Sequence, residues 1–76
     1  MRNAIILFAH GSRDPLWRAP MEAVAARIAA HHPDRGVACA YLELCPPTLA
    51  EATDQLIAQG AASVTVVPMV LASGKH

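Results

Sequence analysis

The sequence predicts an α/β fold with three layers, α/β/α, built on a parallel sheet of strand order 2-1-3. Three short apolar runs alternate with two helical patterns, which gives the element order β-α-β-α-β. The first run is apolar throughout, as expected for a strand covered on both faces. Right-handed crossovers then place this strand between the other two, with one helix on each face of the sheet. Residues 1–76 are expected to form one domain.

The first strand is predicted at about residues 4–9, and a helix follows it. Large apolar residues recur at spacings of three and four on one helix face: Trp17, Met21, Val24 and Ile28. This pattern predicts that the first two of them lie in the core. Pro20 is expected in or near the first turn, where its missing N–H does little harm. The helix is expected to end near His31 or His32, because Pro33 disfavours helical geometry just before it.

The second half of the pattern repeats this arrangement. A strand is predicted at about residues 37–42 and another, rich in valine, at about residues 63–68. Between them, Thr48 and Glu51 form the pattern of a capping box, which predicts the start of the second helix. Gly60 fits the position directly after the end of that helix.

The composition gives no support to two classes of partner. The formal net charge is zero and no basic run occurs, so nothing favours nucleic-acid binding. No apolar stretch approaches the roughly 20 residues that span a membrane. The N-terminus also lacks the pattern of a signal peptide. The protein is therefore expected in the cytoplasm, with Cys39 and Cys45 as reduced thiols.

The predicted sheet is incomplete. Hydrophobic residues make up 54% of the chain and charged residues 16%, which predicts exposed apolar surface on an isolated copy. Two helices cannot cover both faces of three strands fully, and the third strand would be an open edge. The chain is therefore expected to pair as a homodimer or to lack a C-terminal segment. Its end directly after a loop favours a truncated domain.

A residue able to bind a metal follows each predicted strand: His10, Glu43 and His76. Parallel strands end at the same edge of the sheet, and ligands bind there, where the strand order reverses. Two imidazoles and a carboxylate suit a divalent first-row metal, and the same groups can accept protons near neutral pH. Each residue also has an ordinary interpretation. These are a hydrogen-bonded turn residue for His10, a solvated charge for Glu43 and a disordered terminus for His76.

The start of the first helix predicts a site for anions. Gly11, Ser12 and Arg13 are expected to open this helix, and helix N-termini bind anions. Arg13 and Lys75 could then hold carboxylates or phosphates at the rim, or could be solvated surface cations. Ser12 lacks the motif around a nucleophilic serine, and Cys45 is expected to be a small buried filler.

Three motifs together resemble those of a known family. They are "LFAHGSRDP" at the first strand end, "AYLELCPPTLAEA" at the second and "VTVVPMVLASGKH" at the third. In this order and spacing they resemble the class II tetrapyrrole chelatases. The resemblance is to the small CbiX-type sirohydrochlorin cobaltochelatases and the related ferrochelatases of sirohaem synthesis. It covers essentially the whole chain and implies a chelatase-like domain that is incomplete at its C-terminus.

The resemblance implies an enzyme, a lyase that inserts a divalent metal into sirohydrochlorin without ATP or an organic cofactor. Cobalt is the first expectation, in cobalamin synthesis, and iron and nickel are the others. His10 and His76 are implied to bind the metal and to accept protons, and Glu43 to bind metal or relay protons. Sirohydrochlorin is a polycarboxylate, and its implied contacts are Gly11, Ser12, Arg13 and Lys75.

Two other functions stay open at this point. One is a histidine phosphatase, in which a nucleophilic histidine also stands at a strand end. In such enzymes an arginine that holds phosphate precedes the histidine, whereas Ala9 precedes His10 here. The other is a non-catalytic half-domain that binds a metal through His10 and His76 and acts on no tetrapyrrole.

Overall fold

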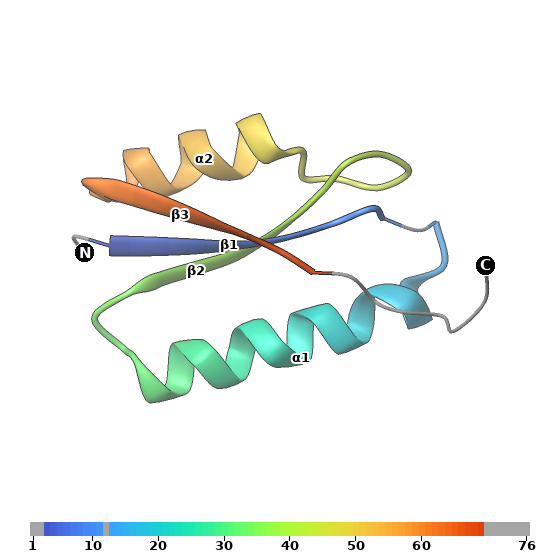
Figure 1. The fold of residues 1–76 in the computed structure, drawn as a ribbon, viewed down its shortest axis with the longest axis horizontal. Coiled ribbons are helices and arrows are strands. Elements are labelled where there is room, and N and C mark those ends of the chain that lie inside the picture. The colour runs from blue at the N-terminus through green and yellow to red at the C-terminus, as the bar shows by residue number, and fades with distance from the viewer. Residues whose placement is uncertain (1–2, 12, 70–76) are drawn as a thin grey trace.

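The fold consists of three strands and two helices in the predicted order (Figure 1). The computed structural model describes residues 3–11 and 13–69 of the chain. The elements are β1 (Asn3–Ala9), α1 (Pro15–His31), β2 (Gly36–Tyr41), α2 (Leu49–Ala58) and β3 (Ser63–Pro68). The expected element order is therefore confirmed, and each observed strand agrees with its predicted range to within one residue at either end.

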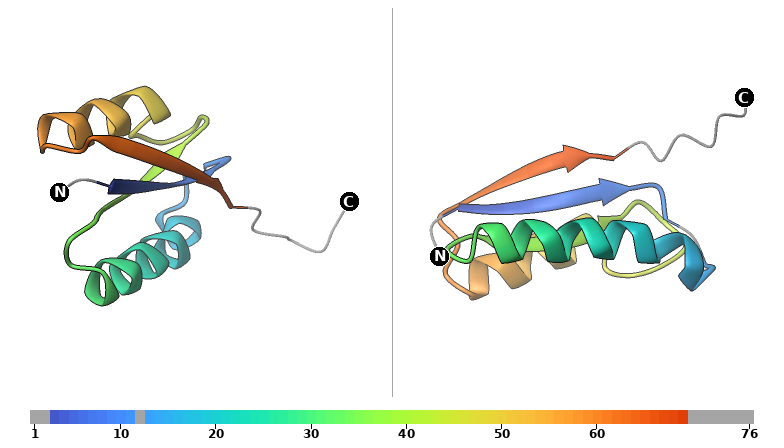
Figure 2. Two further views of the ribbon diagram at one scale, coloured as in Figure 1. Left: turned by 60° about the vertical axis from the view of Figure 1, so that its left-hand side comes forward. Right: turned by 90° about the horizontal axis from the view of Figure 1, so that it is seen from below.

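The sheet is parallel and has the predicted order β2-β1-β3. The first strand in the chain lies in the middle. It pairs with β2 from Ala4↔Gly36 onward and with β3 from Asn3↔Ser63 onward. Figure 2 shows α1 and α2 on opposite faces of this sheet. The three-layer α/β/α arrangement is confirmed.

The core is divided by the sheet into two clusters, because side chains of a strand alternate between its faces. On the α2 face the buried residues are Ala4, Ile6, Ala40, Ala52 and Leu56. On the α1 face they are Leu7, Ala9, Met21 and Tyr41. The apolar first strand therefore supplies both clusters, which explains why it has no polar position between residues 4 and 9.

Helix α1 turns a different face to the sheet than predicted, and its first turn lies before Pro20. Asp14 is its N-cap, so Pro20 lies inside the helix and not in its first turn. Trp17 is 60% exposed and Val24 is exposed as well, so the predicted core position of Trp17 is wrong. The face that packs on the sheet contains Met21, with Ala25 and Ile28 partly buried beside it.

Neither described helix has the length and apolar character needed to cross a membrane.

Helix α2 begins and ends as predicted. The Thr48 side chain accepts a hydrogen bond from the Glu51 N–H, and the Glu51 carboxylate accepts one from the Thr48 N–H. At the other end Gly60 adopts a φ of 106°, in the region that favours glycine. The Gly60 N–H donates to the Ile57 carbonyl and the Ala61 N–H to the Leu56 carbonyl, which closes a Schellman motif.

The two helices leave β3 largely uncovered. Helix α1 packs mainly against β2, and α2 packs against β2 and β1. Val66 and Val67 of β3 are 39% and 36% exposed, although they are large apolar residues in a strand. Among the described residues β3 pairs only with β1, so its outer edge is open. The expectation of exposed apolar surface on a single copy is confirmed.

Candidate functional site

The carboxyl ends of β1 and β2 bring two predicted site residues into direct contact. His10 follows β1 and Glu43 lies two residues beyond the end of β2. The His10 Nε2 atom is 3.0 Å from the Glu43 Oε2 atom. Both side chains are exposed, with 64% and 57% of their surfaces accessible. The pair therefore lies at the edge where ligands bind in parallel α/β sheets.

Backbone pairing beyond the strand ends holds these two residues opposite each other. The Leu42 N–H donates to the Ala9 carbonyl over 2.9 Å, and the Glu43 N–H donates to the His10 carbonyl over 3.0 Å. The loop after Glu43 folds back, and the Pro47 carbonyl accepts a hydrogen bond from the Tyr41 N–H. Leu42 and Glu43 are thus bonded to the end of β1, and the loop after them is bonded to Tyr41, so the backbone supports the His10–Glu43 contact on both sides.

The chemistry of this pair suits a metal that binds and leaves. An imidazole nitrogen and a carboxylate are both ligands of divalent first-row metals. Among the described residues no group of three or more His, Cys, Asp or Glu side chains could enclose a metal ion. Two exposed ligands leave most coordination positions to water or to another molecule, and each of the two groups can also accept a proton.

The remaining predicted site residues have different outcomes. Ser12, Lys75 and His76 lie outside the described residues. Gly11 is partly buried next to Glu43, and Arg13 is exposed. The helix does not start at residues 11–13 as expected. It starts at Pro15 and is capped by Asp14, whose carboxylate accepts the Leu16 N–H over 2.9 Å. This carboxylate occupies the helix end that we expected to attract anions.

Two groups that the predicted mechanism does not use lie beneath the site, on the α1 face of the sheet. The Tyr41 hydroxyl is buried, and its one neighbour for a weak hydrogen bond among the described residues is the Cys39 thiol. Burial raises the pKa of the Tyr41 phenol from its ordinary 10.0 to about 12, and the nearby Cys39 and Glu22 add to the effect. Burial also raises the pKa of the Cys39 thiol, which donates a weak hydrogen bond to the Met21 carbonyl. A neutral, buried thiol is a poor nucleophile.

Cys45 follows the site by two residues and is the other free cysteine. It is partly buried and packs against the α1-face cluster, as expected for a small filler. The structure therefore assigns packing roles to both cysteines.

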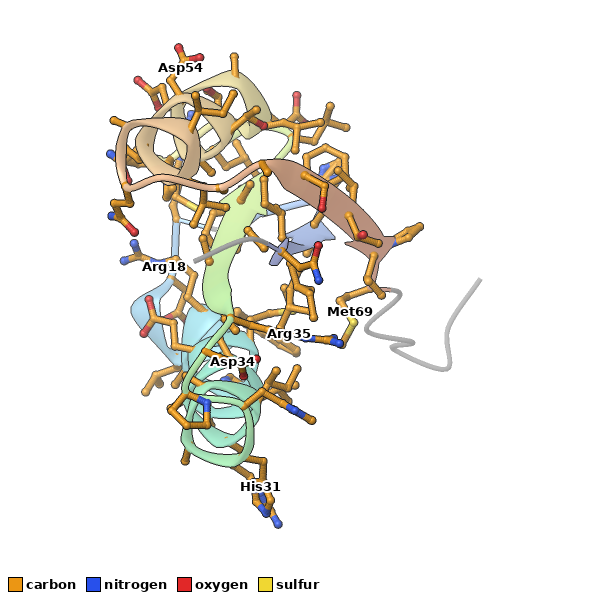
Figure 3. The ribbon with its side chains drawn as sticks, turned by 90° about the vertical axis from the view of Figure 1, so that its left-hand side faces the viewer. Arg18, His31, Asp34, Arg35, Asp54 and Met69 are labelled. Atoms are coloured by element: carbon orange, nitrogen blue, oxygen red, sulfur yellow. The ribbon has the colours of Figure 1, made fainter. Side chains whose placement is uncertain are left out.

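Arg18 of α1 is partly buried, and the sequence analysis did not single it out. It precedes Met21 by three positions, and Met21 is followed by Ala25 and Ile28 on the same helix face. Its Nε atom is buried and hydrogen bonds to no described residue. In Figure 3 Arg18 lies between α1 and the level of the sheet, whereas His31 points outward from α1 and Asp54 outward from α2. The sequence feature that could have revealed this burial is the spacing of Arg18 from Met21, which places a cation on the apolar face of the helix.

Comparison with known proteins identifies the family. A family model described as CbiX matches residues 4–76. A sirohydrochlorin cobaltochelatase of Methanopyrus kandleri is 36% identical over 73 residues, covering 96% of this chain and 51% of that protein. A protein of the same name from Saccharolobus islandicus is 35% identical over 72 residues, covering 95% and 55%. The chain thus spans about half the length of the curated relatives it matches.

A solved structure agrees with this match. A CbiX protein from Marinobacter aquaeolei VT8 superimposes with a TM-score of 0.74 at 38% sequence identity. The match covers 97% of this chain and 60% of that one. The implied family and its fold are therefore confirmed from both sequence and structure, and the chain belongs to the CbiX family.

Proposed function

We propose that the complete protein inserts a divalent metal into sirohydrochlorin, with cobalt as the first candidate. The observation that carries this proposal is the exposed His10–Glu43 pair, 3.0 Å apart, at the ligand-binding edge of a CbiX chain. The names of the relatives supply the substrate and the metal. Iron and nickel suit the same ligand types, so the choice of cobalt depends on those names. The proposed setting is the cytoplasm, and no organic cofactor or ATP is needed.

Metal insertion requires the removal of two protons. The two pyrrole N–H groups of the macrocycle are replaced by two bonds to the metal, and two protons leave. His10 and Glu43 are two proton acceptors at one place, which matches this number. We propose that each takes one proton from the macrocycle and releases it to water, to which both side chains are exposed.

The same two side chains are proposed to deliver the metal. A metal that must be transferred should be held by few protein ligands, so that its other positions can exchange. His10 and Glu43 provide two such ligands. His76, which lies outside the described residues, is proposed as a third. A metal bound between the first two would replace their mutual hydrogen bond.

The polycarboxylate substrate requires cations and N–H donors at the rim. Arg13 is exposed and lies three residues after His10, and it is proposed to contact a substrate carboxylate, together with Gly11. Ser12 and Lys75 are proposed for the same role. These four assignments come from the family resemblance and remain proposals.

The uncovered side of β3 is relevant to the prediction of a homodimer or of a further segment. Its exposed valines and unpaired edge are a surface that stable domains cover. A second copy or a further segment would each cover it, and both stay predictions. The mass of the complete protein in solution, measured by light scattering, distinguishes a homodimer from a longer monomer.

The proposed function is tested by following cobalt insertion into sirohydrochlorin by visible absorbance. We expect His10→Ala and Glu43→Gln to lower the rate by about 10²–10⁴-fold, the usual contribution of a positioned acid–base group. His31→Ala is the matched control, because His31 is an exposed histidine at the far end of α1. An undiminished rate in His10→Ala would refute the site. Hydrolysis of an aryl phosphate without added metal would instead support the phosphatase interpretation.

A further inference from the structure

The turn after β1 presses the backbone of Gly11 against the backbone of Glu43. A Cβ atom at position 11 would collide with the Glu43 carbonyl oxygen. It would also lie 3.2 Å from the Cβ atom of Tyr41. Real Cβ atoms essentially never approach another heavy atom to less than 3.0 Å. Any other residue at position 11 must therefore push the β1 end and the Glu43 backbone apart.

Both members of the pair stand directly before a residue in the left-handed region. Gly11 follows His10 with a φ of 107°, and Leu44 follows Glu43 with a φ of 76°. A leucine in this region is uncommon, and such backbone strain concentrates at functional sites. The backbone therefore changes direction immediately after His10 and immediately after Glu43. The pair is left at the tip of the extended β1–β2 ladder.

We infer that Gly11 is a positioning residue, whose missing side chain keeps His10 and Glu43 in contact. The close approach at Gly11 allows the Glu43 N–H to reach the His10 carbonyl over 3.0 Å. This bond fixes the separation of the two backbones and hence of the two side chains. A Cβ atom at position 11 displaces Glu43 without altering either side chain of the pair. The effect of this displacement on catalysis rests on the proposed function. The loss of the His10–Glu43 contact does not depend on that function.

Gly60 provides a matched control within the same chain. Its φ of 106° is nearly the same as that of Gly11, but a Cβ atom built on it meets nothing within 4 Å. Gly60→Ala therefore introduces the unfavourable backbone conformation alone. Gly11→Ala introduces the same conformation and the collision with Glu43. The difference between the two variants isolates the collision.

The test is titration of the purified protein with Co²⁺, followed by the visible absorption bands of the bound ion. We expect Gly11→Ala to bind Co²⁺ about 10–100-fold more weakly and to change its absorption bands, as when a residue that orients a ligand is lost. Gly60→Ala should retain the parent's spectrum and affinity, although both variants melt at lower temperature. Equal Co²⁺ affinity in the two variants would overturn the inference.

Two further measurements keep the outcomes distinct. If the parent protein binds Co²⁺ but inserts no metal into sirohydrochlorin, the proposed function is contradicted. The comparison of Gly11→Ala with Gly60→Ala still tests the positioning role in that case. If Gly11→Ala does not fold, amide hydrogen exchange of the parent decides. The Glu43 amide should be protected like that of Tyr41 in β2, and exchange at an exposed-loop rate would contradict the inference.

Discussion

The phenol of Tyr41 tests the packing beneath the site most directly, because it is the one tyrosine of the chain. The residue is 3% exposed, and among the described residues its hydroxyl has only the Cys39 thiol as a weak partner. Tyr41→Phe removes this hydroxyl and leaves the ring in place. A buried polar group without a partner costs about 1–3 kcal/mol. We therefore expect the variant to be more stable than the parent by about 1 kcal/mol at neutral pH.

The raised pKa of Tyr41 also predicts how this difference changes with pH. The ordinary value is 10.0 and the folded value is about 12, so the unfolded phenol ionises first. The unfolded state then binds fewer protons than the folded state, and stability falls as the pH rises from about 10 to about 12. Below pH 10 nothing is lost. Two pH units correspond to at most about 2.7 kcal/mol, and we expect about 1–2 kcal/mol after screening by solvent.

Two assays measure these effects. Tyrosinate absorbance in the folded protein reports Tyr41 alone, and urea unfolding at pH 8 and pH 11 compares the parent with Tyr41→Phe. The parent should lose stability relative to the variant between these pH values. A phenol that ionises near pH 10 in the folded protein would refute the account of its burial. A variant less stable than the parent at pH 8 would show that the contact of the hydroxyl with Cys39 is a stabilising hydrogen bond.

Three further substitutions test the fold. Ile6→Ala empties the centre of the α2-face cluster, where Ile6 is 0% exposed, and should lower the free energy of unfolding by about 2–5 kcal/mol in a urea titration. Thr48→Ala removes one half of the capping box and should cost about 0.5–2 kcal/mol, measured the same way. A wild-type value would show that the cap contributes nothing. Trp17→Ala should change stability by less than about 0.5 kcal/mol, since Trp17 is largely exposed, and a loss above 2 kcal/mol would restore its predicted core position.

Most of the fold could be predicted because each element carries its own local signal. The capping box at Thr48 and the glycine at position 60 mark the two ends of α2, and both depend only on neighbouring residues. The strand order follows from the handedness of parallel crossovers. Helix α1 was misjudged because it is rich in alanine. Met21 and Ile28 belong to two possible apolar faces of this helix. The face that also contains the small Ala25 lets the helix pack closely on the sheet, and this is the face observed. The face that contains the large Trp17 would keep the helix farther from the sheet.

The site could be predicted only in outline. Parallel strands that are neighbours in the sheet end at one edge, so His10 and Glu43 could be expected near each other. Their direct contact depends on backbone pairing beyond the strand ends and on the close approach at Gly11. These are contacts between segments about 30 residues apart, and neither leaves a pattern in the local sequence. The buried Nε of Arg18 was missed for a related reason, since its burial depends on the face that α1 turns to the sheet.

The central place of β1 in the sheet has a consequence for how the protein is made. Ala4 pairs with Gly36 on one side and with Val64 on the other. The segment NAIILFA thus leaves the ribosome before either of its neighbours, and the last of them follows about 60 residues later. At about 5–20 residues per second this interval lasts about 3–12 s. Throughout it the apolar strand has at least one unpaired edge, so the nascent chain is most open to misassembly at the segment that later positions His10.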